Sequence, residues 1–248
     1  MKSIRKDKIM EIIFKKKFVT IHELSKELNV VPITIRRDLE ALSNEGKLIK
    51  IHGGAKLKSY IENEFDYLEK KEKNEDEKIE IAKKAASLIT NNDIIYIGPG
   101  TTTEKILEYI ENKNVTVITN SMVIIQKYAN LPNIELIILG GIFKKKSKAI
   151  LPYLFENFAN ILNVNKVFIG TNGIFENKVT YSDISEGKIE EIMINNSIES
   201  YILLDNSKFD KKSFFSFDMK NKKINLITDS KISKELIIKY SKYFNILD

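Results

Sequence analysis

From residue 76 to the end of the chain, helical segments alternate with short runs of β-branched apolar residues. The runs "DIIYI", "VTVIT", "IELIIL", "KVFIG", "YILLD", "INLIT" and "FNIL" are typical of strands, and "EKIEIAKKAASLI", "TEKILEYI" and "MVIIQKYA" are typical of helices. Strands joined through helices make right-handed crossovers and a mainly parallel sheet. We therefore expect an α/β fold whose twisted, largely parallel sheet is covered on both faces.

The excess of positive charge lies in the first quarter of the chain. Residues 1–58 contain fourteen Lys and Arg against seven Asp and Glu, whereas residues 59–78 contain four against eight. This distribution of charge is typical of a protein that binds a polyanion through a small basic module, joined by an acidic polar connector to a nearly neutral body. The alternative is that the charge runs are simply solvated faces of the protein. We expect three parts: a module at 1–58, a connector at 59–75 and a body at 76–248.

The basic module has the spacing of a helix-turn-helix. Apolar residues at 4, 9, 12 and 13 predict a first helix, and Thr20 with Glu23 forms a capping-box pattern that opens a second helix at 21–28. Pro32 suits the first position of a third helix, in which Ile35, Leu39 and Leu42 form the buried stripe. Gly46 is expected to end that helix as a left-handed cap. The third helix would then enter a major groove.

The exposed side of the third helix and the segment after it carry the predicted DNA contacts. Arginine bonds guanine bidentately or clamps phosphate, although Arg36 and Arg37 could instead pair with neighbouring carboxylates on a solvated helix. The following "KLIKIHGGAKLK" alternates and turns at its glycines, which predicts a β-wing near the backbone phosphates. The candidate DNA-binding residues are Thr34, Arg36, Arg37, Glu40, Lys50, His52, Gly53 and Lys56.

Small and hydroxyl-bearing residues gather directly after five of the predicted strands. In an open α/β sheet the loops beyond the carboxyl ends of the strands line the ligand crevice, so we expect these loops to converge, although each alone is an ordinary turn. "GPGTTT" at 98–103 feeds a predicted helix and has the chemistry of a phosphate cradle. The candidate ligand-binding residues are Gly100, Thr101, Thr102, Thr103, Asn120, Ser121, Gly140, Gly141, Lys144, Gly170, Asn172, Gly173, Asp205 and Lys208.

The stretch "IHELSKELNVVPITIRRDLEALSNEGKLIKIHGGAKL" resembles the winged helix-turn-helix of the DeoR family of bacterial sugar-metabolism regulators. Its most specific strings are "TIRRDL" from Thr34 and "HGGA" from His52. The family usually places a serine at the cap of the recognition helix, where this chain has Val31. That helix start therefore lacks a side-chain acceptor, which costs about 0.5–2 kcal/mol of local stability.

The loops of the body resemble the sensor domain of the same family, so the likeness covers nearly the whole chain. It rests on "GTTT" at Gly100, "TNS" at Thr119, "LGG" at Leu139 and "DNSKF" at Asp205. The resemblance implies the fold of ribose-5-phosphate isomerase and a phosphorylated-sugar ligand. At four positions that the resemblance places at or near the ligand, this chain departs from the family. The family commonly has an aspartate where this chain has Gly98, an arginine where it has Lys144, an aspartate where it has Asn172 and a lysine where it has Glu190.

Several classes of function are excluded or disfavoured by composition. The chain has no cysteine, so disulfides, thiolate metal sites and thiol nucleophiles are excluded, and no metal or cofactor is expected. The rival interpretation is a sugar-phosphate isomerase-like enzyme with an appended DNA-binding module. Such an enzyme needs a base beside the carbonyl carbon. Both histidines lie in the basic module, and Asp183, Glu186 and Asp205 remain possible bases that no sequence pattern pairs.

Together these observations predict a non-enzymatic transcription regulator. We expect a repressor of sugar or polyol genes that binds double-stranded operator DNA under the control of a phosphorylated sugar or polyol. A single winged module binds weakly, so a homodimer or homotetramer is expected. No segment has the eighteen continuous apolar residues of a membrane helix, and the N-terminus has no secretory core, so a cytoplasmic location without membrane partners is expected.

Overall fold

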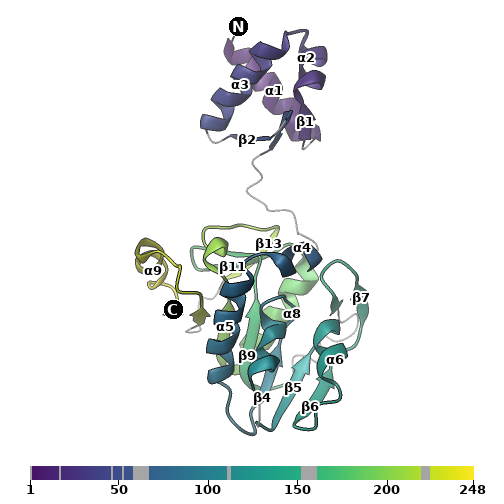
Figure 1. The fold of residues 1–248 in the computed structure, drawn as a ribbon, viewed down its shortest axis with the longest axis vertical. Helices are drawn as coiled ribbons and strands as arrows, with labels where there is room; N and C mark the ends of the chain where they lie inside the picture. Colours follow the sequence, from purple (N-terminus) through teal and green to yellow (C-terminus); the bar gives the residue numbers. More distant parts are fainter. Residues whose placement is uncertain are drawn as a thin grey trace. The chain divides into compact units, whose positions relative to one another are not determined.

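The computed structural model describes residues 2–16, 18–45, 47–51, 53–57, 67–110, 113–151, 161–218 and 224–248. The chain divides into two compact units, Met1–Tyr60 and Ile61–Asp248 (Figure 1).

The first unit is a three-helix module with a small sheet. Its helices are α1 (Lys2–Lys16), α2 (Ile21–Leu28) and α3 (Pro32–Asn44), and its strands are β1 (Phe18–Thr20), β2 (Leu48–Ile51) and β3 (Gly54–Leu57). The strands form an antiparallel sheet in the order β1-β3-β2. The predicted stripe of α3 is buried together with Ile9 and Ile13 of α1. The three predicted helices and the wing are confirmed, and β1 is an additional strand.

The second unit is built on a seven-stranded, all-parallel sheet in the order β15-β14-β12-β9-β4-β5-β6. The strands are β4 (Ile94–Ile97), β5 (Val115–Thr119), β6 (Ile134–Ile138), β9 (Val164–Gly170), β12 (Ser197–Leu203), β14 (Asn225–Ile227) and β15 (Asn245–Leu247). All seven overlap predicted strands, although β12 begins four residues before the predicted segment and ends two residues before its end. The chain runs outward from β4 through β5 to β6, then returns at β9 and runs outward the other way. The switch point therefore lies between β4 and β9.

Both faces of this sheet are covered, as expected. One face packs against α5 (Glu75–Ser87), the 3₁₀ helix η1 (Thr103–Tyr109) and α6 (Met122–Tyr128). The other face packs against α8 (Ile184–Asn195) and α9 (Lys234–Tyr240), with an antiparallel sheet of β10 (Gly173–Phe175), β11 (Lys178–Tyr181) and β13 (Phe215–Asp218). Successive side chains of a strand point to opposite faces, so Tyr96 joins one core while Ile95 and Ile97 join the other.

Three features differ from the sequence-based expectations. The antiparallel sheet β10-β11-β13 and the hairpin of β7 (Ile142–Lys144) and β8 (Ala149–Leu151) were not predicted, because three- or four-residue strands carry little periodicity. The segment 103–109 is a 3₁₀ helix and not an α-helix. A short helix, α4 (Tyr67–Glu72), lies within the expected connector but belongs to the second unit, because Tyr67 is buried. The bounds of the connector stay a prediction, since residues 58–66 lie outside the described ones.

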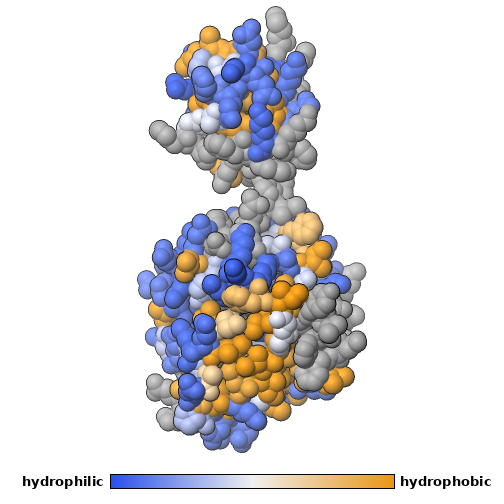
Figure 2. Space-filling model, turned by 90° about the vertical axis from the view of Figure 1, so that its right-hand side faces the viewer, coloured by the Kyte–Doolittle hydropathy of each residue, from blue (hydrophilic) through white to orange (hydrophobic). Residues whose placement is uncertain are grey.

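Strand β6 is the last strand at one edge of the parallel sheet, and apolar side chains are exposed there. Ile138 is 48% exposed, and Ile142 and Phe143 of the adjoining β7 are 56% and 40% exposed. Figure 2, turned toward this side of the unit, shows apolar side chains gathered on the surface. Within the described residues, no helix is both long and apolar enough to span a membrane.

Candidate functional site

The helix-turn-helix of the first unit is fixed by local contacts. Thr20 caps α2: its Oγ1 accepts the amide of Glu23 at 3.1 Å, and the Glu23 carboxylate accepts the amide of Thr20 at 2.7 Å. Asn29 ends α2 in the left-handed conformation with φ 52°, which turns the chain toward Pro32 at the start of α3. The predicted capping box and the predicted start of α3 are both confirmed.

The exposed face of α3 carries both predicted arginines. Arg36, Arg37 and Glu40 are exposed, and Thr34 is half-buried. Asp38 faces inward, is 1% exposed and accepts a hydrogen bond from Nη2 of Arg5 at 3.2 Å. Within the described part of the chain, neither Arg36 nor Arg37 forms an ion pair. Their guanidinium groups are therefore available to a polyanion.

The start of α3 lacks a side-chain cap, as expected for Val31. Val31 is 62% exposed and Ile33 is 54% exposed, so two apolar side chains stand near the arginines. Apolar side chains in a major groove contact the methyl group of thymine. Neither Val31 nor Ile33 is among the DNA-binding residues that the sequence predicted.

The wing is an antiparallel pair in which Leu48 opposes Leu57 and Ile51 opposes Gly54. Gly53 has φ +78°, a conformation that favours glycine, and a Cβ on Gly54 would lie 2.3 Å from the carbonyl oxygen of Val19. Lys50 is exposed, with Nζ 3.4 Å from Oε2 of Glu40 on α3. The residues His52 and Gly46 and the side chain of Lys56 lie outside the described residues.

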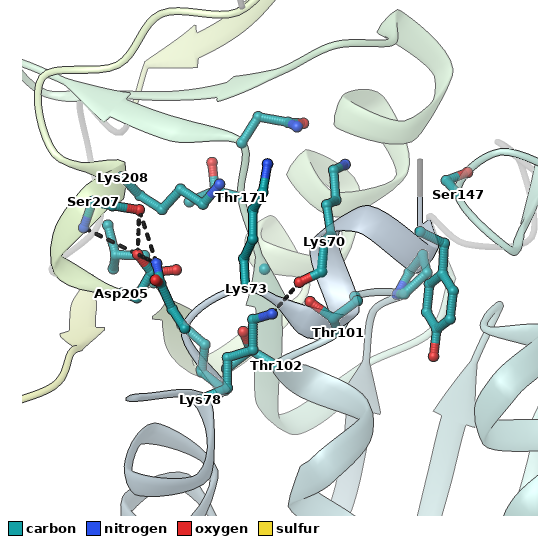
Figure 3. Close-up of a pocket in the computed structure, with 18 of the residues that line it drawn as sticks. Lys70, Lys73, Lys78, Thr101, Thr102, Ser147, Thr171, Asp205, Ser207 and Lys208 are labelled. Atoms are coloured by element: carbon teal, nitrogen blue, oxygen red, sulfur yellow. Dashed lines mark hydrogen bonds between the residues drawn. The ribbon is translucent and has the colours of Figure 1, made fainter. Parts of the chain in front are cut away.

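A cavity of about 250 Å³ lies in the second unit at the switch point of the parallel sheet (Figure 3). It is lined by the loops after β4, β9 and β12, where open α/β sheets bind ligands. Seven predicted ligand residues lie in its wall: Gly100, Thr101, Thr102, Gly170, Asn172, Asp205 and Lys208.

The three threonines after Gly100 have different roles. Thr101 and Thr102 line the cavity, and their hydroxyls make no hydrogen bond within the described residues. Thr103 is fully buried, and its hydroxyl donates to the carbonyl oxygens of Gly98 at 2.7 Å and Gly100 at 3.0 Å. The first two hydroxyls are therefore available to a ligand, whereas the third holds the loop.

The remaining predicted ligand residues are not among the lining residues and have other contacts. Asn120 is buried, accepts a hydrogen bond from the Tyr96 hydroxyl at 2.8 Å and donates to the carbonyl oxygen of Ile150 at 3.0 Å. Ser121 caps α6, Lys144 forms ion pairs, and a Cβ on Gly173 would lie 2.4 Å from Cβ of Lys211. Gly140 and Gly141 follow β6, three strands from β9 in the sheet.

One side of the cavity is formed by residues that sequence reasoning missed. They come from α4, the turn after it and the start of α5: Tyr67, Lys70, Lys73, Asn74 and Lys78. The other polar lining residues that were not predicted are Ser147, Thr171, Tyr181, Glu186, Ser207 and Lys211. The lysine spacing in "YLEKKEKNEDEK" was a possible signal, but the neighbouring acidic residues favoured a solvated connector.

Lys78 joins α4 to the cavity wall. It is 4% exposed, and its ammonium group donates to the carbonyl oxygens of Lys70 and, at 3.4 Å, Lys71 (Figure 3). Burial lowers the pKa of Lys78 to about 8, although the nearby Asp205 carboxylate favours the charged form. The ammonium group thus satisfies carbonyl groups at the end of α4.

The carboxylates considered as enzymatic bases already hold other partners. Oδ1 of Asp205 accepts the amide of Ser207 at 3.0 Å and the Asn74 amide group at 3.0 Å. Asp183 caps α8, and Nζ of Lys144 lies 3.1 Å from Asp183 and 2.9 Å from Glu186. Hydrogen bonds and the Lys144 charge lower the pKa of Asp183 in spite of its partial burial. The lowered pKa makes Asp183 a poor proton acceptor. No cluster of metal-ligating side chains occurs among the residues that the structure describes.

The family models match both units of the chain. A DeoR-like helix-turn-helix domain matches residues 5–60, and a DeoR C-terminal sensor domain matches residues 73–230. The lactose phosphotransferase system repressor of Lactococcus lactis subsp. lactis is 36% identical, over 99% of this chain and 98% of that protein. The protein of the same name from Staphylococcus aureus strain NCTC 8325 is 32% identical, over 98% of each chain.

The solved structures give a more distant likeness. A ribose 5-phosphate isomerase A from Methanocaldococcus jannaschii matches with a TM-score of 0.40 and 22% identity, over 55% of each chain. The eIF2B delta structure from Chaetomium thermophilum matches with a TM-score of 0.48 and 18% identity, over 63% of this chain and 57% of that one. The sequence matches carry the assignment: this chain belongs to the DeoR family of DNA-binding transcriptional repressors, with a helix-turn-helix domain followed by a sensor domain.

Proposed function

We propose that this protein represses genes of a sugar phosphotransferase system by binding operator DNA, and that a phosphorylated sugar or polyol in the sensor cavity controls that binding. The names of the relatives support the class of genes. The observation that carries the ligand class is the cavity wall, in which the hydroxyls of Thr101 and Thr102, without a hydrogen-bond partner among the described residues, stand among lysines.

On the DNA side, the proposal rests on the exposed arginines of α3 and on the wing. Arg36 and Arg37 reach the base edges or phosphates of a major groove, and Lys50 reaches the adjacent backbone. Because one small module makes few contacts, two or more copies act together on an operator with repeated half-sites. We therefore propose a homodimer or a homotetramer.

On the ligand side, the oxygens of a phosphate group accept hydrogen bonds from the hydroxyls of Thr101 and Thr102 and from the lysine ammonium groups. Hydrogen bonds between charged partners are about twice as strong as neutral ones, so the phosphate dominates affinity. The segment after Gly100 leads into a seven-residue 3₁₀ helix, so the phosphate is held by side chains and loop amides and not by the dipole of a long helix.

Helix α4 supplies the link between ligand and DNA. It is the first described helix after the winged module in the chain, and it lines the cavity through Tyr67 and Lys70. The Tyr67 hydroxyl donates to Oε1 of the buried Glu104 at 2.5 Å, and Lys78 bonds the carbonyls at the other end of the helix. A ligand that binds Lys70 therefore changes how firmly α4 is held. Residues 58–66 join α4 to the DNA module along the chain, and they pass this change on to operator binding.

Operator binding with and without effector tests this function. The probe is labelled DNA from upstream of the protein's own gene, and its affinity is measured by fluorescence anisotropy in the presence of matched sugars and sugar phosphates. We expect specific binding that a phosphorylated sugar changes by about 5- to 150-fold, whereas the unphosphorylated sugar has no effect. Equal effects from the two forms, or no specific DNA binding, would overturn the proposal.

A further inference from the structure

The exposed face of α3 is apolar at one end and charged further along. Ile33, Arg36, Arg37 and Glu40 are all exposed and are spaced i, i+3, i+4 and i+7, so they form one stripe along the helix. Ile35 is fully buried on the core side of the same helix. The stripe therefore begins with an apolar side chain at the N-terminal end of α3 and continues with two guanidinium groups.

The residues just before this stripe are apolar as well. Val31, the N-cap residue of α3, is 62% exposed, Ile33 is 54% exposed, and Pro32 between them is also exposed. The first turn of α3 contains no acidic residue. A single exposed apolar side chain is ordinary on a protein surface, but three in succession beside two arginines form a patch that a partner could cover.

The backbone and the side-chain chemistry hold this patch in one shape. The carbonyl oxygen of Val31 accepts the amides of Thr34 at 3.0 Å and Ile35 at 3.3 Å, and the ring of Pro32 fixes its own φ angle. Val31 and Ile33 are β-branched, so each has few χ1 rotamers. Little conformational freedom is therefore lost when a partner covers them.

The charge around the patch indicates which partner covers it. Within the part of the chain that the structure describes, Arg36 and Arg37 form no ion pair. Residues 1–58 contain fourteen Lys and Arg against seven Asp and Glu. Such a surface is complementary to a polyanion that presents an apolar group beside hydrogen-bond acceptors. In the major groove of DNA, thymine presents a methyl group, and guanine presents two acceptors that arginine can bond.

We propose that Val31 and Ile33 make α3 select operators that carry thymine, by packing on its 5-methyl group. Three to four residues of a helix span about 4.5–6 Å, and successive base pairs are about 3.4 Å apart. The selected thymine therefore lies within about two base pairs of the one that Arg36 or Arg37 faces. The inference deepens the proposed function, because it rests on α3 entering the major groove and names a base that α3 reads there.

Replacement of thymine by uracil tests this inference, because uracil keeps the hydrogen-bonding groups of thymine and lacks only the 5-methyl group. Duplexes that the full-length protein binds are selected from a random-sequence library, and each thymine of their consensus is then replaced singly by uracil. Fluorescence anisotropy titrations measure the affinities. We expect at least one replacement in each half-site to weaken binding by about 3- to 5-fold, since one buried methyl contact is lost.

Alanine variants then show whether the two side chains make this contact. In the double variant Val31→Ala with Ile33→Ala, the same uracil replacement should weaken binding by less than about 1.5-fold, because the methyl group no longer has its partner. Both side chains are exposed, so these substitutions should leave the module folded. Ile238→Ala is the matched control: Ile238 is 77% exposed on α9 of the second unit, and this variant should keep the full uracil effect.

The outcomes separate this inference from the proposed function. A selected operator at which no uracil replacement weakens wild-type binding would overturn the inference and leave the proposed function intact. A uracil effect that persists undiminished in the double alanine variant would also overturn it, because another group or the shape of the DNA would then read thymine. If no sequence is enriched from the library, both the inference and the proposed operator binding are wrong.

Discussion

A Cβ atom placed on Gly98 would lie 2.5 Å from Oε1 and 2.8 Å from Oε2 of Glu190. Both residues are among the four at which this sequence departs from what the family resemblance implies. The two departures are in contact and are sterically coupled: the buried Glu190 carboxyl occupies the space that a side chain at position 98 would need. This relationship is a property of the fold, since 91 residues lie between Gly98 and Glu190 in the sequence.

Gly98→Ala should destabilise the sensor domain because its methyl group overlaps the Glu190 carboxyl. Overpacking a core typically costs about 1–3 kcal/mol, so the urea midpoint should fall with an unchanged denaturant slope. Gly140→Ala is the control, since a Cβ there has no neighbour within 4 Å. Equal stability of the Gly98→Ala and Gly140→Ala proteins would show that the site relaxes freely.

Glu190→Gln should change how stability depends on pH. Burial raises the pKa of Glu190 well above its usual value, so the folded protein keeps a proton that the unfolded chain releases above about pH 4.5. Wild-type stability therefore falls through this group as pH rises from about 4.5 toward the folded pKa. As the pH is raised from 4.5 to 8, the free energy of unfolding of Glu190→Gln should therefore increase relative to that of the wild type. Urea unfolding at each pH measures this difference. A constant difference over this range would mean that Glu190 is ionised in the fold.

Arg36→Ala and Arg37→Ala should each weaken operator binding by about 1–3 kcal/mol if the guanidinium touches a base edge. Lys50→Ala should instead lower the slope of log affinity against log salt by about 1, because it removes one phosphate contact. Lys8→Ala removes an exposed charge from α1, outside the helix-turn-helix, and serves as the control. Unchanged operator affinity in both arginine variants, with folding intact by circular dichroism, would contradict the assignment of α3 to the groove.

The double change Thr101→Val and Thr102→Val should abolish the effector response while effector-free operator binding stays normal. Both hydroxyls are unpartnered within the described residues, so the cavity loses phosphate donors but no internal hydrogen bond. Anisotropy titrations of the operator with and without effector measure both quantities. A normal response in the double variant would remove these threonines from the ligand site. Thr103→Val is a contrasting case, since it breaks two loop hydrogen bonds and should lower stability.

Tyr67→Phe should loosen α4. The substitution removes the donor to Oε1 of Glu104, whose Oε2 has no hydrogen-bond partner within the described structure, and an unsatisfied buried group costs about 1–3 kcal/mol. Amide hydrogen exchange across residues 67–72 should become faster, and the effector should slow it again. Tyr109→Phe is the control. Tyr109 is a half-buried residue of η1, and its substitution should leave the exchange of residues 67–72 unchanged. Unaltered exchange in Tyr67→Phe would mean that other contacts hold the helix.

The sequence by itself determined the elements whose cause is local. The capping box at Thr20, the proline start of α3 and the stripe of Ile35, Leu39 and Leu42 each depend on residues within about two turns, so their spacing sufficed. The seven parallel strands were likewise predictable, because each contains a continuous run of mostly apolar, often β-branched residues.

The tertiary structure alone decided which loops meet. Asn120 and Gly140 carry the same residue types as the loops that line the cavity, but they follow β5 and β6, which lie on the far side of β4 from the switch point. Strand order also brings the turn after α4 beside the loop after β12, where Asn74 donates a hydrogen bond to Asp205, 131 residues later in the sequence. Lysines of the expected connector therefore line the cavity. Local patterns predict elements because they arise from neighbouring residues; the cavity depends on strand order and packing, which are set by contacts between residues far apart in the chain.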